Sequence, residues 1–114
     1  MKDCLFCKIV EKEIPSDFIF EDDRVVAFND ISPQAPTHIL IIPKEHFNSL
    51  MDIPDDKLDI ISHIHNVARK LAQDRKIDGS GFRVVNNCGK EGGQSVGHLH
   101  YHLLGGRQLA WPPG

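Results

Sequence analysis

The stretch Gly97-His98-Leu99-His100-Tyr101-His102-Leu103-Leu104-Gly105-Gly106-Arg107 carries three of the chain's seven histidines at alternate positions, separated by apolar or aromatic residues. Successive side chains of a β-strand point to opposite faces, so His98, His100 and His102 would share one face of a strand. In a helix each step of two residues turns by about 200°, and the imidazoles would scatter around the axis. The spacing therefore predicts a strand that bears a row of three imidazoles.

The chemistry open to this row is broad, because imidazole titrates near neutral pH and serves as a nucleophile, an acid, a base or a metal ligand. Alternate residues of a strand lie roughly 6.5 to 7 Å apart, so the row can address one small substrate. A tris-histidine metal site is the competing interpretation. The sequence of the row does not decide between them.

A glycine-rich segment, Cys88 to Ser95, precedes the histidines. Its glycines allow backbone amides to approach a ligand closely, and Ser95 adds a hydroxyl, which together resemble a cradle for an anion. A flexible hairpin loop is the alternative. The segment leads into a strand rather than a helix, which excludes the P-loop and the dinucleotide fingerprint. Beside three imidazoles, it favours chemistry on a phosphate.

Length and composition limit the class of protein. With 114 residues and 40% hydrophobic content, the chain predicts a single domain over residues 1–114. A formal charge of −3 offers no footprint for a long phosphate backbone, so we expect no nucleic-acid partner. The longest apolar runs are far below a membrane span, and we expect no membrane partner. The three cysteines and the opening without an apolar signal segment predict a reduced, cytoplasmic protein.

Hydrophobic periodicity and turn residues divide the rest of the chain into elements. The predicted helices are a short one over residues 4–14, ending before Pro15, and a long one from Pro54 to about Asp74 or Lys76. The predicted strands, besides the histidine strand, are 18–21, 25–28, 38–42 and 82–87, and the apolar run 38–42 predicts burial on both faces. The connections are too short for parallel crossovers. We therefore predict an α+β fold with a mainly antiparallel sheet, one long helix and one short helix.

Cys4 and Cys7 have the spacing of metal ligands. In a reduced compartment this pair is better interpreted as half of a zinc site than as a disulfide. Two buried thiols on one helix face are the alternative.

The histidine stretch also resembles the His-φ-His-φ-His-φ-φ signature of the histidine-triad (HIT) family, where φ is an apolar residue. The resemblance covers nearly the whole chain. Within the family, the chain is similar to the branch of nucleotide-binding proteins that act as purine nucleoside phosphoramidases. The segments that carry it, besides 98–104, are 13–15, 20–23, 30–38, 42–44, 92–95, 104–107 and 111–114. It implies a HIT-like five-stranded sheet that joins a second sheet across a homodimer.

The resemblance also implies the roles of individual residues. His100 would be the nucleophile that forms a covalent nucleotidyl-histidine with AMP or GMP amides, which splits one displacement into two. His102 and the amides near Ser95 would hold the phosphate oxygens, Ser95 would touch the leaving group, and His38 would steady the triad, in which His98 is the third member. Asp30 would accept the ribose hydroxyls. The remaining implied substrate contacts are Phe6, Ile9, Ile14, Phe28, Ile31, Asn87, Gly93 and Gln94; for Ile9 and Ile14 a plain core role is equally open.

In some bacterial family members that carry this Cys-x-x-Cys pair, two histidines complete the ligand set. The resemblance places them here at His46 and His98. The resemblance therefore implies a structural zinc held by Cys4, Cys7, His46 and His98, while the chemistry itself requires no cofactor. With zinc bound, His98 would place His100 rather than react.

Two other functions are consistent with these residues. One is the hydrolysis of dinucleoside polyphosphates, an activity of a sister branch of the family. The other is a zinc-stabilised dimer that binds nucleotides without turnover. Gly97 stands where many relatives have an aromatic residue and Ala110 where some have a polar residue, which leaves the amine half of the substrate open.

Overall fold

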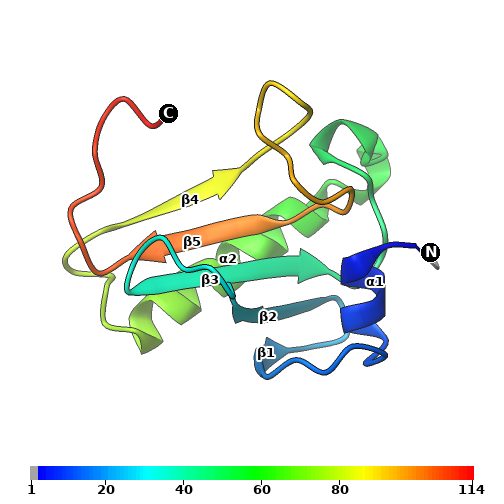
Figure 1. Ribbon diagram of the computed structural model, residues 1–114. Helices are drawn as coiled ribbons and strands as arrows, with labels where there is room; N and C mark the ends of the chain where they lie inside the picture. The colour runs from blue at the N-terminus through cyan, green and yellow to red at the C-terminus, as the bar shows by residue number, and fades with distance from the viewer. Residues whose placement is uncertain (1–2) are drawn as a thin grey trace.

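The computed structural model describes residues 3–114, so residues 1 and 2 of the expected domain lie outside it. Its five strands form one sheet in the order β1-β2-β3-β5-β4, and every neighbouring pair is antiparallel (Figure 1). The elements in chain order are α1 (Leu5–Val10), β1 (Phe18–Glu21), β2 (Val25–Asn29), β3 (Thr37–Pro43), the 3₁₀ turns η1 (Leu50–Asp52) and η2 (Asp55–Lys57), α2 (Asp59–Asp74), β4 (Phe82–Asn86) and β5 (Tyr101–Gly105). The predicted α+β fold with an antiparallel sheet is confirmed.

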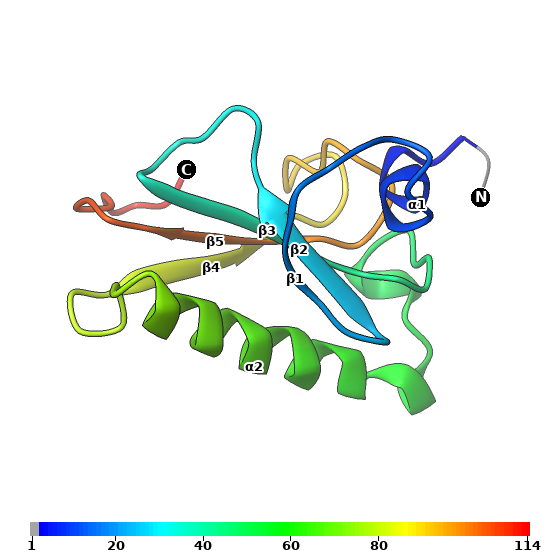
Figure 2. The same ribbon diagram turned by 90° about the horizontal axis from the view of Figure 1, so that it is seen from below.

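The sheet has a helix on each face. Figure 2 shows α2 on one side, and α1, the β2–β3 loop and the C-terminal segment on the other. β3 is buried along its whole length. Its Ile39 and Ile41 join the core under α2, whereas Leu40 and Ile42 join a second apolar cluster with α1. Burial on both faces, predicted from the apolar run, is therefore confirmed.

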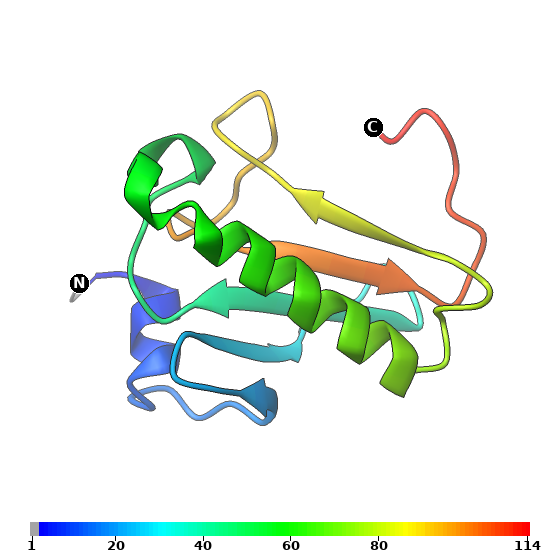
Figure 3. The same cartoon turned by 180° about the vertical axis from the view of Figure 1, so that it is seen from behind.

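The long helix crosses the back of the sheet (Figure 3). It begins at Asp59 rather than Pro54, because the preceding residues form the separate turn η2, and it ends at Asp74 as predicted. Ile60 and Ile64 are buried against the sheet. Burying one such side chain contributes roughly 1.5 to 3 kcal/mol to stability. Within residues 3–114, no helix has the length and apolar character needed to cross a membrane.

The short helix α1 ends at Val10, five residues before Pro15, so the predicted end was wrong. Lys12 adopts a left-handed backbone with φ of 64°. The amide of Lys12 donates to the Ile9 carbonyl and the amide of Glu13 to the Lys8 carbonyl. These two bonds form a Schellman motif, which closes the helix with its own carbonyls before the proline is reached.

The histidine strand is shorter than predicted, since β5 begins at Tyr101 and not at His98. The amide of Leu99 donates to the Phe47 carbonyl at 2.7 Å, outside the sheet. The Asn86 side chain donates to the His100 carbonyl at 2.9 Å, where a strand partner would otherwise bond. His98 and His100 therefore lie in the segment that leads into β5, and only His102 belongs to the strand.

Candidate active site and metal site

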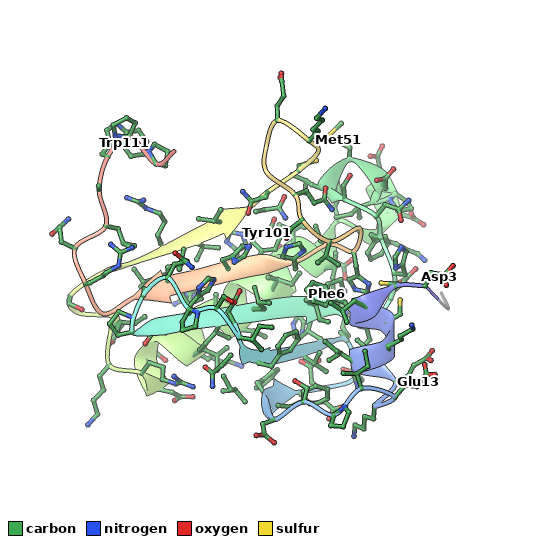
Figure 4. The ribbon with its side chains drawn as sticks, in the orientation of Figure 1. Asp3, Phe6, Glu13, Met51, Tyr101 and Trp111 are labelled. Carbon is green, nitrogen blue, oxygen red and sulfur yellow. The ribbon has the colours of Figure 1, made fainter. Side chains whose placement is uncertain are left out.

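The predicted alternation of faces holds although the strand is shorter. Leu99, Tyr101 and Leu103 are in the core beneath α2. His98 and His100 are buried on the other side, where the Phe6 ring of α1 meets their rings edge-on at 5.9 and 5.2 Å between centroids. Figure 4 shows Phe6 lying beside the strands at the start of α1. The histidines thus share a face with α1, as the period of two requires.

The tautomer of His100 follows from its surroundings. Nδ1 of His100 lies 2.8 Å from the His98 carbonyl oxygen, which can only accept, so Nδ1 carries the proton. The lone pair is then on Nε2, which forms no hydrogen bond within residues 3–114. In that part of the chain Asn86 Oδ1 is the one fully buried side-chain polar atom without a partner. Nε2 of His100 therefore keeps an opening to solvent and has the lone pair that a nucleophile needs.

His38 and His102 form a hydrogen-bonded relay. The Gln34 amide donates to Nδ1 of His38 at 3.0 Å, which leaves the proton of His38 on Nε2. Nε2 of His38 lies 2.9 Å from Nδ1 of His102 and donates to it. The proton of His102 is then on Nε2. His102 can therefore donate a hydrogen bond from Nε2 to a phosphate oxygen.

His102 is neutral at physiological pH. Burial lowers its pKa to about 4, and the neighbouring His100 and His38 add to the effect. Asp30, whose carboxylate lies 3.5 Å from Nε2 of His38, opposes it. Asp30, His38 and His102 each bring one donor atom within 4.8 Å of the others. Both nitrogens of His38 are already engaged, so the hydrogen bonds account for this cluster without a metal.

The glycine-rich loop is braced by its own side chains. Gln94 accepts the Gly89 amide at 2.9 Å through its Oε1 and donates to the Asn48 carbonyl at 2.6 Å, so its polar atoms hold the loop. Asn87 donates to the Gly92 carbonyl at 2.7 Å. Ser95 is exposed. Gly93 has a positive φ of 79°, a conformation that glycine adopts without strain.

The apolar residues expected around a purine divide into two groups. Phe6, Ile9 and Phe28 are buried in the cluster between α1 and the sheet, with Ile14 packed against it. Their present packing is that of core residues. Ile31, in contrast, is 99% exposed on the β2–β3 loop beside Asp30. An isolated apolar side chain at this position is free to cover a ligand.

The four predicted zinc ligands converge although they come from distant parts of the chain. Cys4 and Cys7 of the α1 region, His46 and His98 place one ligand atom each within 4.8 Å of one another. Nδ1 of His98 lies 3.3 Å from the Cys4 sulfur, and Nδ1 of His46 lies 3.3 Å from the Cys7 sulfur. Burial and the neighbouring Cys4 thiol raise the pKa of Cys7.

The orientation of the two imidazoles fits a metal. Nε2 of His98 donates to the Pro43 carbonyl at 2.8 Å, and Nε2 of His46 lies 2.7 Å from the Asn48 side-chain oxygen. Both Nδ1 lone pairs therefore point inward, only 3.1 Å apart. Two sulfurs and two imidazole nitrogens are the donor set of closed tetrahedral zinc sites, and outer hydrogen bonds of this kind fix the ligand tautomer. The residues present fit a zinc ion.

Sequence patterns did not reveal several residues of the site. Gln34 acts through its backbone amide and Pro43 through its carbonyl, and neither group has a side-chain signature. Asn48 lies only two residues after His46, and this short spacing is the one sequence signal that could have indicated its outer hydrogen bond. Arg83 and Arg107 line a pocket together with His102, which only the packing of β4 against β5 shows.

The chain is similar to several known proteins. The family model described as scavenger mRNA decapping enzyme C-term binding matches residues 3–109. A HIT family hydrolase from Legionella pneumophila Philadelphia 1 is 52% identical, with a TM-score of 0.96 over 98% of this chain and 100% of that one. A histidine triad protein from Clostridium difficile is 58% identical, with a TM-score of 0.94 over 96% of each chain. The 14 kDa zinc-binding protein of Brassica juncea is 47% identical over 98% of this chain and 100% of its own length.

Proposed function

The chain belongs to the histidine-triad family, and we propose that it is a purine nucleoside phosphoramidase, which hydrolyses the P–N bond of AMP or GMP amides. The likeness to a HIT family hydrolase supports a hydrolytic activity for this chain. The geometry of His100 supports a reaction in which this histidine attacks the phosphorus. The single observation that carries the proposal is the hydrogen bond from Nδ1 of His100 to the His98 carbonyl, because it directs the lone pair to the accessible Nε2.

In the first step, the lone pair on Nε2 of His100 attacks the α-phosphorus. A P–N(His) bond forms, the P–N bond to the amine breaks, and the departing nitrogen takes up one proton from solvent. His102 donates its Nε2 proton in a hydrogen bond to a non-bridging oxygen, which lowers the cost of the charge that develops there. Because His102 is neutral and its orientation is held by His38, this donor is in place before the substrate binds.

In the second step, water attacks the phosphorus of the nucleotidyl-histidine. The bond to Nε2 of His100 breaks, its electron pair returns to the ring, and the water releases one proton. The products are the nucleoside monophosphate, the free amine and regenerated His100. The proton retained on Nδ1 throughout makes the imidazole a good leaving group.

The nucleoside would lie on the α1 side of the triad. Asp30 follows β2 and would accept the ribose hydroxyls with the carboxylate that already accepts the Ser32 amide at 2.7 Å. The exposed Ile31 would cover one face of the purine, and the cluster containing Ile9 and Phe28 would meet the other. Asn87, Gly93 and Ser95 would lie on the phosphate and leaving-group side.

The zinc would be structural and held by Cys4, Cys7, His46 and His98. Zinc bound there supplies a cross-link between α1 and the segment before β5, with no open position for chemistry. The zinc-binding name of the Brassica relative supports this assignment, as does the inward direction of both Nδ1 lone pairs. We also propose that two copies associate, since β4 is an edge strand whose outer backbone groups have no partner strand within residues 3–114.

A fluorogenic AMP–amine conjugate tests the proposed reaction directly. We expect turnover by the native protein and a loss of about 10³-fold or more in His100→Ala. His65→Ala, an exposed histidine of α2, is the matched control and should retain full activity. Brief reaction and acid quenching should trap the nucleotide on the native protein but not on His100→Ala.

Undiminished turnover by His100→Ala would exclude His100 as the nucleophile. Faster cleavage of diadenosine polyphosphates than of the AMP amide would favour the dinucleoside polyphosphate reaction. Nucleotide binding without turnover of either substrate would favour the non-catalytic, zinc-stabilised dimer.

A further inference from the structure

A pocket of about 510 Å³ opens beside His102 on the side of the sheet opposite α2. Arg83 and Val85 of β4 lie on this face because they pair with Leu104 and His102 of β5, and partners in register share a face. Arg107, just after β5, also lines the pocket. Figure 1 shows the C-terminal segment, in red, curling back from the end of β5 toward β4. The pocket is large enough for a small organic group.

Two guanidinium groups of this pocket lack a counter-ion. Arg83 donates to the Ala110 carbonyl at 2.8 Å, and Arg107 donates to the Gln34 and Gln108 carbonyls at 3.0 and 2.9 Å. Carbonyl oxygens fix the orientation of both side chains but do not neutralise their charge. Within residues 3–114 neither arginine forms an ion pair, and the pocket lining contains no Asp or Glu. Of the side chains that line the pocket, only the two guanidinium groups carry a full charge, and Gly114, the last residue given, lines it as well.

The position of the pocket relative to His102 indicates which part of a substrate would reach it. The order β2-β3-β5-β4 puts Asp30, after β2, on one side of His102 and Arg83, on β4, on the other. Arg107 contacts the Asp30 side as well, through the Gln34 carbonyl of the β2–β3 loop. A phosphoramidate phosphorus carries the nucleoside through one oxygen and the leaving group through nitrogen. With the nucleoside on the Asp30 side, the leaving group has the β4 side available.

We propose that Arg83 and Arg107 form a subsite for a leaving group that carries a carboxylate, so that the preferred substrates are nucleoside phosphoramidates of acidic amines such as amino acids. This inference rests on the proposed function, since it names the substrate class of that same site. A guanidinium recognises a planar carboxylate through two parallel hydrogen bonds, a geometry that an ammonium cannot offer. The same charge would also attract the phosphates of a dinucleoside polyphosphate, so the experiment must separate the two.

Two substrates that differ only in charge test the subsite: AMP joined through nitrogen to glycine, and AMP joined through nitrogen to glycinamide. We expect the native protein to favour the glycine conjugate by about tenfold in kcat/KM, the effect of one charge-assisted hydrogen bond. Arg83→Gln and Arg107→Gln should each remove most of that preference, because each should lower kcat/KM for the glycine conjugate more than for the glycinamide conjugate. Arg83→Lys should retain part of it. Arg69→Gln, an exposed arginine of α2 on the opposite face, is the matched control.

Binding to His100→Ala makes the test independent of turnover. Calorimetry should show tighter binding of the glycine conjugate than of the glycinamide conjugate, and loss of the difference in His100→Ala/Arg83→Gln. Equal affinities for the two conjugates would overturn the subsite even where the native protein hydrolyses both. A binding preference without hydrolysis would retain the subsite and reject the proposed reaction. Diadenosine triphosphate serves as the competing ligand. If it binds more tightly than the glycine conjugate, and does so only when Arg83 is present, that result would overturn the assignment of the subsite to a carboxylate. Thermal unfolding of each variant verifies that it is folded.

Discussion

The carbonyl oxygen of His98 accepts the Nδ1 proton of His100 at 2.8 Å, while the ring of His98 lies in the Cys/His cluster, 3.3 Å from the Cys4 sulfur. One residue therefore connects the proposed zinc site to the proposed nucleophile, through its side chain on one side and its backbone on the other. A shift of the His98 backbone would therefore affect both the cluster and the carbonyl that sets the tautomer of His100.

Removal of the metal tests whether the Cys/His cluster holds a structural zinc. We expect one zinc per chain by native mass spectrometry. Chelation should lower the midpoint of thermal unfolding by about 10 °C or more, since structural zinc contributes directly to folding. Cys4→Ser should behave like the chelated protein, because it removes one of four ligands. Cys88→Ser, a change outside the cluster, is the control and should leave metal content and unfolding unchanged. An unchanged melting temperature after complete chelation would contradict a structural zinc.

Stability should depend on pH through His102. Its pKa is about 4 in the folded protein and near 6.5 when unfolded, so between these values the unfolded chain binds more protons. The contribution of His102 is therefore complete above about pH 6.5 and is lost as the pH falls toward 4. Urea unfolding at pH 7.5 and pH 5 should show a smaller decrease for His102→Asn than for the native protein. Equal decreases would show that the pKa of His102 does not differ between the folded and the unfolded protein.

The proposed ribose contact of Asp30 can be tested with matched substrates. Asp30→Asn should raise KM for the AMP amide by about tenfold, because a carboxylate accepts stronger hydrogen bonds than an amide oxygen. The 2′,3′-dideoxy analogue lacks both hydroxyls and should be affected far less. An equal loss with both substrates would instead assign Asp30 to the support of His38, whose Nε2 lies 3.5 Å away.

Two glycines of the loop before β5 make a matched pair. A Cβ at Gly92 would lie 2.3 Å from the Cys88 carbonyl oxygen, whereas a Cβ at Gly97 meets nothing within 4 Å. Gly92→Ala should force the loop to shift, destabilise the protein by roughly 1 to 3 kcal/mol and lower kcat/KM. Gly97→Ala should change stability by no more than about 0.5 kcal/mol. Chemical denaturation and steady-state kinetics of both variants verify the difference, and equal behaviour would show that the loop accommodates the extra carbon.

Much of the fold was predictable from local patterns. The hairpin β1–β2, the fully buried β3 and the end of α2 at Asp74 agree with the sequence, because hydrophobic periodicity reports which faces are buried. The element boundaries that differ depend on interactions that periodicity does not encode. α1 ends at a left-handed Lys12, and β5 begins late because the Leu99 amide bonds to Phe47, far away in the chain.

The alternation of the three histidines over 98–102 was enough to predict that they share a face, since a period of two is a local property of extended backbone. It could not distinguish their roles, because the three positions have the same pattern. Only the tertiary structure did so, through neighbours remote in sequence: Cys4, 94 residues away, meets His98, and His38, 64 residues away, donates to His102. His100 keeps a free Nε2. A repeated local pattern sets the face of the backbone to which each side chain points. The hydrogen-bond partners and tautomers of those side chains depend on which distant segments the fold brings together.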